Sequence, residues 1–172
     1  MDPSAEQTTA RHLSPGELFG VQVSPPFYHP PTDDDVYEVV GAVADAADVG
    51  IVLYTTYWKG YQPSLELISR LAEMPSLIGL KWASPSITTF EQGLRLFAKR
   101  LAVIDNNFPF VYSHLLGARG INTHPSNYWP QWGVRLWGLL EAGKYREAQD
   151  EVTRVVTPYY EANSKSLTGS GD

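Results

Sequence analysis

The sequence has 172 residues, of which 43% are hydrophobic and 19% are charged, so it can build one domain with a sizeable core and is not wholly disordered. Its formal net charge is −6 and it has no basic stripe, which argues against nucleic acid as a partner. It contains no cysteine, which excludes disulfides, thiolate zinc sites, iron–sulfur clusters and cysteine nucleophiles.

The amino terminus does not match a targeting segment. Residues 1–6 (MDPSAE) contain neither the basic region nor the apolar region that a secretory signal peptide requires. Every apolar run is far shorter than the ~20 residues of a membrane-spanning helix. We therefore expect a cytoplasmic protein without a membrane partner.

The composition divides the chain into three parts. Residues 1–16 have little periodicity and residues 164–172 form a Ser/Gly tail, so we expect a flexible amino-terminal segment and a disordered tail. Residues 17–163 are expected to form the folded domain. Within it, short apolar runs predict strands at residues 18–23, 49–54, 77–81 and 101–104, with a very short one at 120–122.

Helical patterns follow these strands. The acidic stretch Thr32–Asp35 predicts a helix start, and valines then recur at helical spacing. Three apolar residues between the second and third strands share one helix face: Leu65, Ile68 and Ala72. The stretch Thr88–Glu91 fits a capping box at the start of the next helix. Further helices are expected at residues 110–116, 126–141 and 144–156.

The repeat length narrows the architecture. The first four predicted strands begin about 25 to 30 residues apart, which is the size of a βα unit. Near-continuous apolar strands indicate a parallel sheet that helices cover. This pattern leaves an open doubly wound sheet or a barrel. Because no Gly-x-Gly-x-x-Gly follows any strand, a dinucleotide-binding domain is disfavoured.

Two polar side chains end predicted strands and are candidates for chemistry. Lys81 ends the third strand, and Tyr54 ends the second. Neighbouring parallel strands would bring both to one rim, where functional sites of such folds collect. An apolar setting would lower the pKa of Lys81 and leave more free amine to attack a ketone, while a phenol can relay protons. The alternative is that both side chains end in solvent.

Other polar and aromatic residues favour structural roles. His29, His114 and His124 lack metal-ligand spacing and the sequence has no cysteine, so no metal site is expected. The run Asp33–Asp35 fits a helix amino terminus better than a metal site. The tryptophans on the predicted helix near the carboxyl end fit packing better than ligand stacking: Trp129, Trp132 and Trp137.

Several motifs together carry a family resemblance. They are VSPPFY (23–28), Tyr54, IGLKWAS (78–84), GARG (117–120) and LEAGKYREA (140–148). In order and spacing they resemble the dihydrodipicolinate synthase/N-acetylneuraminate lyase family from residue 20 to about residue 160. Those proteins are class I aldolases and dehydratases that form a Schiff base on a (β/α)8 TIM barrel.

The resemblance implies a role for individual residues. Lys81 matches the lysine that forms an imine with pyruvate or a related 2-oxo acid, and Tyr54 matches the tyrosine that stabilises it and passes protons. Ser24 falls where the family has Thr or Ser before Pro. Ile121 and Asn122 match a short strand whose backbone faces the bound 2-oxo acid. The implied chemistry uses no cofactor.

Two positions depart from the synthase branch of the family. Phe27 stands where that branch has a second relay tyrosine, and a phenyl ring cannot relay a proton. The loop at Tyr57–Gly60 lacks the arginine that clamps substrate carboxylate there, and Lys59 offers a point charge instead of a bidentate fork. Both departures favour an aldolase or dehydratase relative over a lysine-biosynthetic synthase.

The largest departure from the family is the length of the chain. A family barrel needs about 250 residues, whereas the five predicted strands resemble the fourth to the eighth. We therefore expect a partial TIM barrel, from a fragment, a truncated product or half of an assembly. If active, the protein is a lyase that acts on a 2-oxo acid, and exposed sheet edges favour a homo-oligomer. The alternatives are an inactive family member with a structural or interaction role, one that needs a partner to complete the barrel, or an unrelated open α/β binding domain.

Overall fold

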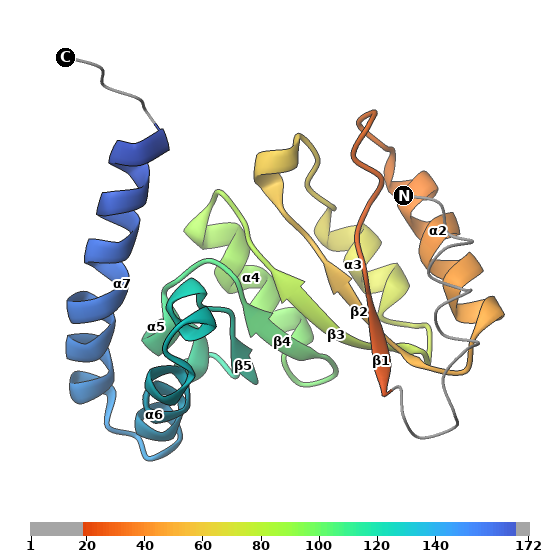
Figure 1. Ribbon diagram of the computed structural model, residues 1–172. Coiled ribbons are helices and arrows are strands. Elements are labelled where there is room, and N and C mark those ends of the chain that lie inside the picture. The colour runs from red at the N-terminus through yellow and green to blue at the C-terminus, as the bar shows by residue number, and fades with distance from the viewer. Residues whose placement is uncertain (1–18, 168–172) are drawn as a thin grey trace.

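The five strands form one parallel sheet whose spatial order follows the sequence order (Figure 1). The computed structural model describes residues 19–167. Its strands are β1 (Gly20–Val23), β2 (Gly50–Tyr54), β3 (Leu77–Trp82), β4 (Ala102–Asp105) and β5 (Gly120–Ile121). Consecutive parallel order is that of a barrel wall, because a doubly wound sheet reverses its order at a switch point. The fold is therefore a partial (β/α)8 barrel, as the sequence predicts.

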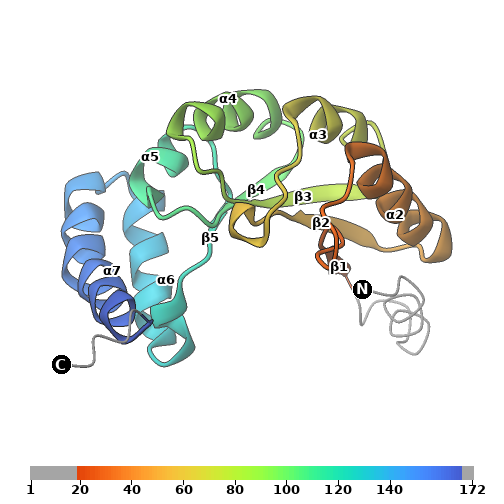
Figure 2. The same cartoon turned by 90° about the horizontal axis from the view of Figure 1, so that it is seen from above.

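Helices line the outer side of this arc. Figure 2 shows α2 (Asp33–Ala46), α3 (Leu65–Leu71), α4 (Ile87–Phe97) and α5 (Phe110–Leu115) along the convex side of the sheet. Beyond β5 the chain forms α6 (Pro130–Glu141) and α7 (Tyr145–Leu167), and two 3-10 helices, η1 (Tyr57–Lys59) and η2 (His124–Asn127), follow β2 and β5. No helix within the described residues is both long and apolar enough to cross a membrane.

Strand side chains alternate between the two faces of the sheet. Those under the helices are almost completely buried: Val23, Leu53, Leu80 and Val103 are at most 1% exposed. The opposite face, which would line a barrel interior, is partly exposed at Val52, Ile78 and Ile104. The near-continuous apolar strands thus combine one sealed face with one open face.

Close packing holds α4 against β3. The Trp82 side chain is fully buried under this helix, with its ring 5.4 Å from that of Phe90. Gly93 faces the same ring, and a Cβ atom at this position would lie 1.7 Å from Trp82 Cη2. The glycine in this helix therefore permits the close approach of helix and sheet.

Local capping starts the helices. Thr32 and Asp35 form a reciprocal capping box at α2, which explains the predicted acidic start. The capping box predicted at Thr88–Glu91 is wrong, because Ser86 caps α4 by accepting from Thr89 N. Ser86 lies two residues earlier, and its side chain has the same capping chemistry as threonine.

The carboxyl-terminal helices build a second core. Trp132, Leu136 and Leu140 of α6 pack against Ala148 and other residues of α7. At the outer side of this pair, Glu151 accepts hydrogen bonds from Trp132 and from two arginines, Arg135 and Arg154. The predicted packing role of Trp132 fits its exposure of 1%.

Two predicted boundaries differ in this region. The expected helix at 126–141 is interrupted, because Trp129 precedes Pro130 and has non-helical backbone angles of φ −138° and ψ 68°. The final helix extends to Leu167, so residues 164–167 of the predicted tail are helical. The predicted flexible segment 1–16 and residues 168–172 lie outside the described part of the chain.

Candidate active site at the carboxyl ends of the strands

Lys81 and Tyr54 lie side by side on the open face of the sheet. They are direct register partners on β3 and β2. Their flanking residues Leu53, Leu80 and Trp82 point to the helices, so Lys81 and Tyr54 point to the opposite face. The Lys81 Nζ atom lies 4.1 Å from the centroid of the Tyr54 ring. The two side chains that the sequence places at one rim therefore touch.

The environment of Lys81 favours its neutral amine. The side chain is partly buried, and this burial lowers the pKa of Lys81 below the ordinary value because desolvation penalises the ammonium form. Among the described residues, no carboxylate forms an ion pair with it. The face of the Tyr54 ring attracts a cation, so this contact opposes part of the shift in the pKa of Lys81.

Asn122 lies on the same face, one strand beyond β4. Its backbone N–H donates to Asp105 O over 2.8 Å, and its side-chain Nδ2 donates to Asn106 Oδ1 over 2.7 Å. Gly120, two residues earlier, faces Ile104, which is the register partner of Lys81. Asn122 therefore projects from the open face, nearer the carboxyl ends of the strands than Lys81.

The other predicted site residues lie further from Lys81 or point elsewhere. The Ile121 side chain packs into the helical core of α6 and α7, so only its backbone lies at the rim. Ser24 follows β1 and lines a cavity of about 20 Å³ that Thr56 and Tyr61 also line. Lys59 belongs to η1, and its side chain lies outside the described part of the structure.

Asp105 is a buried carboxyl group that the sequence reasoning missed. It is 0% exposed and accepts hydrogen bonds from Ser113 Oγ over 2.5 Å and from Asn107 N over 2.6 Å. Burial raises the pKa of Asp105 to about 6, although these hydrogen bonds oppose the shift. Its side chain points to α5, on the side of the sheet away from Lys81. It therefore supports the loop after β4 and does not face the site.

The run Asp105–Asn107 is the sequence signal that could have identified these residues. Three polar residues directly after an apolar strand mark the point where the chain leaves the sheet at its functional rim. Asn106, the middle residue, is 3% exposed and faces the same side as Asn122. The sequence reasoning missed Asn106 as well.

Two of the other titratable candidates, Asp33 and His114, have structural partners. Asp33 accepts hydrogen bonds from Tyr61 and Ser64, and His114 contacts Glu141 over 3.0 Å. Within residues 19–167, no group of three histidine or acidic side chains is placed to hold a metal ion.

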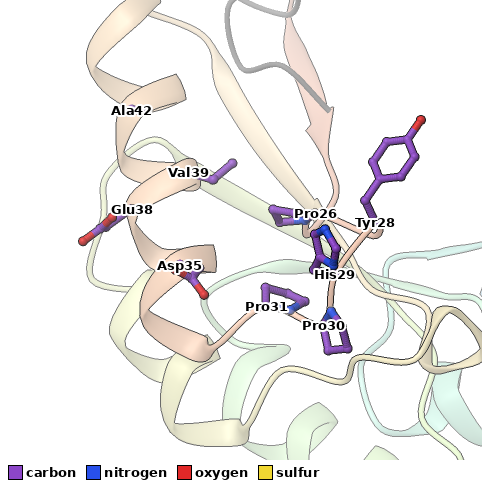
Figure 3. A pocket seen from close by; sticks show the side chains of 9 residues that line it. All are labelled: Pro26, Tyr28, His29, Pro30, Pro31, Asp35, Glu38, Val39 and Ala42. Atoms are coloured by element: carbon purple, nitrogen blue, oxygen red, sulfur yellow. The ribbon is translucent and has the colours of Figure 1, made fainter.

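Cavities lie at both ends of the arc. One, of about 520 Å³, lies between the proline-rich loop after β1 and the face of α2 that carries Glu38, Val39 and Ala42. Figure 3 shows the side chains that line it. Another, of about 460 Å³, lies along β5 and α6 and includes Arg119 and Trp137. The first adjoins the loop after the edge strand β1 and the second adjoins the edge strand β5, and the next βα unit of a closed barrel would pack at each of these ends.

The chain belongs to the dihydrodipicolinate synthetase family, whose model matches residues 9–166. It is 28% identical over 141 residues to 4-hydroxy-tetrahydrodipicolinate synthase from Syntrophus aciditrophicus, covering 81% of this chain and 48% of that protein. The corresponding synthase of Methanothrix thermoacetophila is 27% identical over 143 residues, with coverage of 81% and 48%. The chain thus spans about half the length of these relatives and corresponds to the carboxyl-terminal portion of the barrel.

Solved structures show the same fold. The pyruvate complex of dihydrodipicolinate synthase from Acinetobacter baumannii superimposes with a TM-score of 0.82 at 19% identity, covering 92% of this chain and 55% of that one. The Aquifex aeolicus synthase gives a TM-score of 0.81, also at 19% identity and with the same coverage of both chains.

Proposed function

We propose that this chain carries the Schiff-base centre of a lyase that acts on pyruvate or a related 2-oxo acid, with Lys81 as the nucleophile. The observation that carries the proposal is the contact between a partly desolvated Lys81 and its register partner Tyr54. Membership of the family supports the same chemistry, because the sequence resemblance implies an imine-forming lysine at this position and one structurally similar synthase is a complex with pyruvate.

The proposed reaction begins when the neutral Lys81 amine attacks C2 of the 2-oxo acid. The carbon–oxygen double bond opens to a carbinolamine, whose hydroxyl group then takes up a proton and leaves as water. The product is a protonated imine between Lys81 and C2. This cation withdraws electrons from the adjacent carbon, so a carbon–carbon or carbon–oxygen bond can break without another cofactor. Tyr54 is the proton relay for the loss of water.

Ser24, Lys59, Ile121 and Asn122 belong to the proposed substrate-binding set. Ser24 and Lys59 lie in the segments that follow β1 and β2, at the same end of the sheet as Lys81. Ile121 and Asn122 contribute backbone and amide groups at the rim of β5. The set contains no bidentate arginine, so a substrate with one carboxylate fits it better than one with two.

Reductive trapping tests the nucleophile. Incubation of the protein with pyruvate and borohydride should add the mass of one reduced pyruvyl group, and peptide mapping should place it on Lys81. Lys81→Met keeps an apolar chain of similar length and should abolish the adduct. Lys99→Met, on the loop after α4, is the matched control and should retain it. A wild-type protein without an adduct at high pyruvate would refute the proposal.

A second variant separates the two functions of Tyr54. Tyr54→Phe keeps the ring that contacts Lys81 but removes the hydroxyl group. The adduct should still form, about 10²-fold or more slowly, because proton relay contributes on that order to such steps. An unchanged trapping rate would show that Tyr54 is only a packing partner.

The open ends of the arc favour a second candidate, an interaction role. The cavities beside α2 and α6 and the exposed inner face give a complementary body a place to pack. In this case three further βα units would complete the barrel and enclose Lys81. Light scattering of the protein mixed with the amino-terminal half of a relative would detect such a complex, and a mixture of separate species would refute it.

A further inference from the structure

A small polar cavity lies between the segments that follow β1 and β2. Three side chains with hydroxyl groups help to line it: Ser24, Thr56 and Tyr61. Its volume of about 20 Å³ is enough for one water molecule, and an internal water needs two to four polar partners, roughly the number of these hydroxyl groups. The cavity can therefore hold one bridging water.

The strand register places this cavity beside Tyr54. Val23 and Leu53 are register partners on β1 and β2, and both point to the helices. The next residues, Ser24 and Tyr54, are therefore neighbours across the two strands and face the opposite, open side, about 4.8 Å apart along the sheet. Thr56 lies two residues beyond Tyr54 and faces the same way. Ser24 thus stands between Tyr54 and the cavity.

Tyr61 connects the cavity to the surface of the protein. It lies in the loop before α3, and its Oη atom donates to Asp33 Oδ1 over 2.5 Å. Ser64 Oγ donates to the other oxygen of the same carboxylate. Asp33 is the first residue of α2 and is partly exposed, so its carboxylate can exchange protons with solvent.

The ionisation of these two groups fits the outward movement of a proton. Burial and the hydrogen bond to Asp33 raise the pKa of Tyr61 above its ordinary value, so the phenol stays protonated. Burial of Asp33 acts in the opposite sense, but hydrogen bonds from Ser64 and Tyr61 hold its pKa below its usual value. The carboxylate is therefore ionised at neutral pH and can accept a proton from Tyr61 as the phenol takes up another.

The chemistry proposed for Lys81 produces a proton that must leave the site. When the protonated imine of pyruvate loses a proton from C3, the electrons of the C3–H bond form a C2–C3 double bond. The π electrons of the C–N double bond return to nitrogen, which leaves a neutral enamine on Lys81 and one proton. Tyr54 contacts Lys81 and is the first acceptor in reach.

We propose that Tyr61 and Asp33 form the outer half of a proton path from Tyr54 to solvent. Ser24 and one cavity water form its inner half. Each hydroxyl group takes up a proton on one side and gives up its own on the other, and Asp33 releases the last proton to solvent. This inference rests on the proposed function of Lys81 and adds the route of its protons. Tyr61 and Asp33 act through Tyr54 and touch no substrate atom.

Exchange of the methyl protons of pyruvate with solvent measures this path. In D₂O, each enamine that forms and reverts replaces a methyl proton by deuterium, which proton NMR follows. Wild-type protein should catalyse the exchange, and Lys81→Met should not. Tyr61→Phe keeps the ring but removes the hydroxyl group, and should slow the exchange by about 10²-fold. Its equilibrium yield of the borohydride-trapped pyruvate adduct should be unchanged, because a proton path alters rates and not equilibria.

Two further variants assign the effect to the path. Tyr37→Phe is the matched control, since it removes a phenol hydroxyl group from α2, where the Tyr37 ring contacts Arg70, and it should leave the exchange rate unchanged. Thr56→Val has nearly the shape of threonine but loses a hydroxyl group that holds the water, and it should slow the exchange as Tyr61→Phe does. This variant keeps the test decisive if Tyr61→Phe does not fold.

The outcomes separate this inference from the proposed function. A trapped adduct on wild-type Lys81 together with unchanged exchange in folded Tyr61→Phe would overturn the inference and leave the nucleophile intact. A trapped adduct without any methyl exchange would overturn it too. If Tyr61→Phe lowers the adduct yield as much as the exchange rate, Tyr61 only supports the fold and the path is refuted. If pyruvate yields no adduct with wild-type protein, the proposed function fails, and the inference fails with it.

Discussion

The two faces of the sheet carry different tasks, and β3 shows the contrast within one strand. Leu80 and Trp82 point to the helices and are fully buried, whereas Lys81 points to the open face and is partly exposed. The pairing of β2 with β3 shifts register at Ile78, so alternation is interrupted there and Ile78 also lies on the open face, beside Gly50. The helix-covered face therefore contributes most of the hydrophobic stabilisation of this arc. The open face can place a lysine, a tyrosine and two amides where packing alone would favour apolar residues.

The largest expected effect comes from matched truncations on the two faces of β3. Leu80→Ala should lower the free energy of unfolding by about 2 to 5 kcal/mol, because it leaves a cavity in the core between the sheet and its helices. Ile78→Ala removes a similar volume from the open face, where solvent can fill the space, and should cost on the order of 1 kcal/mol. Urea unfolding followed by circular dichroism measures both.

This comparison can fail in one informative way. If Ile78→Ala costs as much as Leu80→Ala in solution, the open face is covered by another body under the conditions of the measurement. Light scattering of the same samples would then show a species larger than one chain.

On the helix-covered face, the buried Asp105 carboxyl group should make the stability of the fold depend on pH. Its pKa is raised to about 6 in the folded protein, so the unfolded chain loses this proton at lower pH than the native state does. Stability from this group is therefore complete below about pH 4 and is lost as pH rises through 6, by about 3 kcal/mol in total.

Asp105→Asn should remove that loss. The difference in unfolding free energy between the variant and the wild type should shift in favour of the variant by up to about 3 kcal/mol from pH 4 to pH 7.5. Asp48→Asn, which removes an exposed carboxylate, is the control. Parallel pH profiles for wild type and Asp105→Asn would show that folding does not raise the pKa of Asp105.

The sheet and the Lys81–Tyr54 contact were predictable from the sequence because both depend on strand ends. A parallel strand that helices cover reads as a continuous apolar run, and its last residue marks the rim. Two such runs that end in Tyr54 and Lys81 become register partners when the strands are consecutive neighbours. The family motifs identified the order of the strands.

The contact between Asn106 and Asn122 and the exact helix boundaries were harder to predict from the sequence, for physical reasons. Asn106 meets Asn122 only through the register of β4 and β5, which sequence spacing does not specify. The interruption at Trp129 did have a signal, since Pro130 restricts the residue before it, and helical periodicity outweighed that signal in the prediction. Several capping residues in a row leave the start of α4 ambiguous.

The smallest expected effect on stability comes from substitutions at the start of α4, and they test which residue caps this helix. Ser86 Oγ accepts from Thr89 N over 3.2 Å, so Ser86→Ala should lower the free energy of unfolding by about 1 kcal/mol. Thr88 lies inside the first turn and is exposed, and Thr88→Ala should change it by no more than about 0.5 kcal/mol, because alanine has the better helix propensity. Urea unfolding midpoints at constant slope compare the two variants. A larger cost for Thr88→Ala than for Ser86→Ala would mean that the helix starts at Thr88 in solution, as the sequence pattern alone predicts.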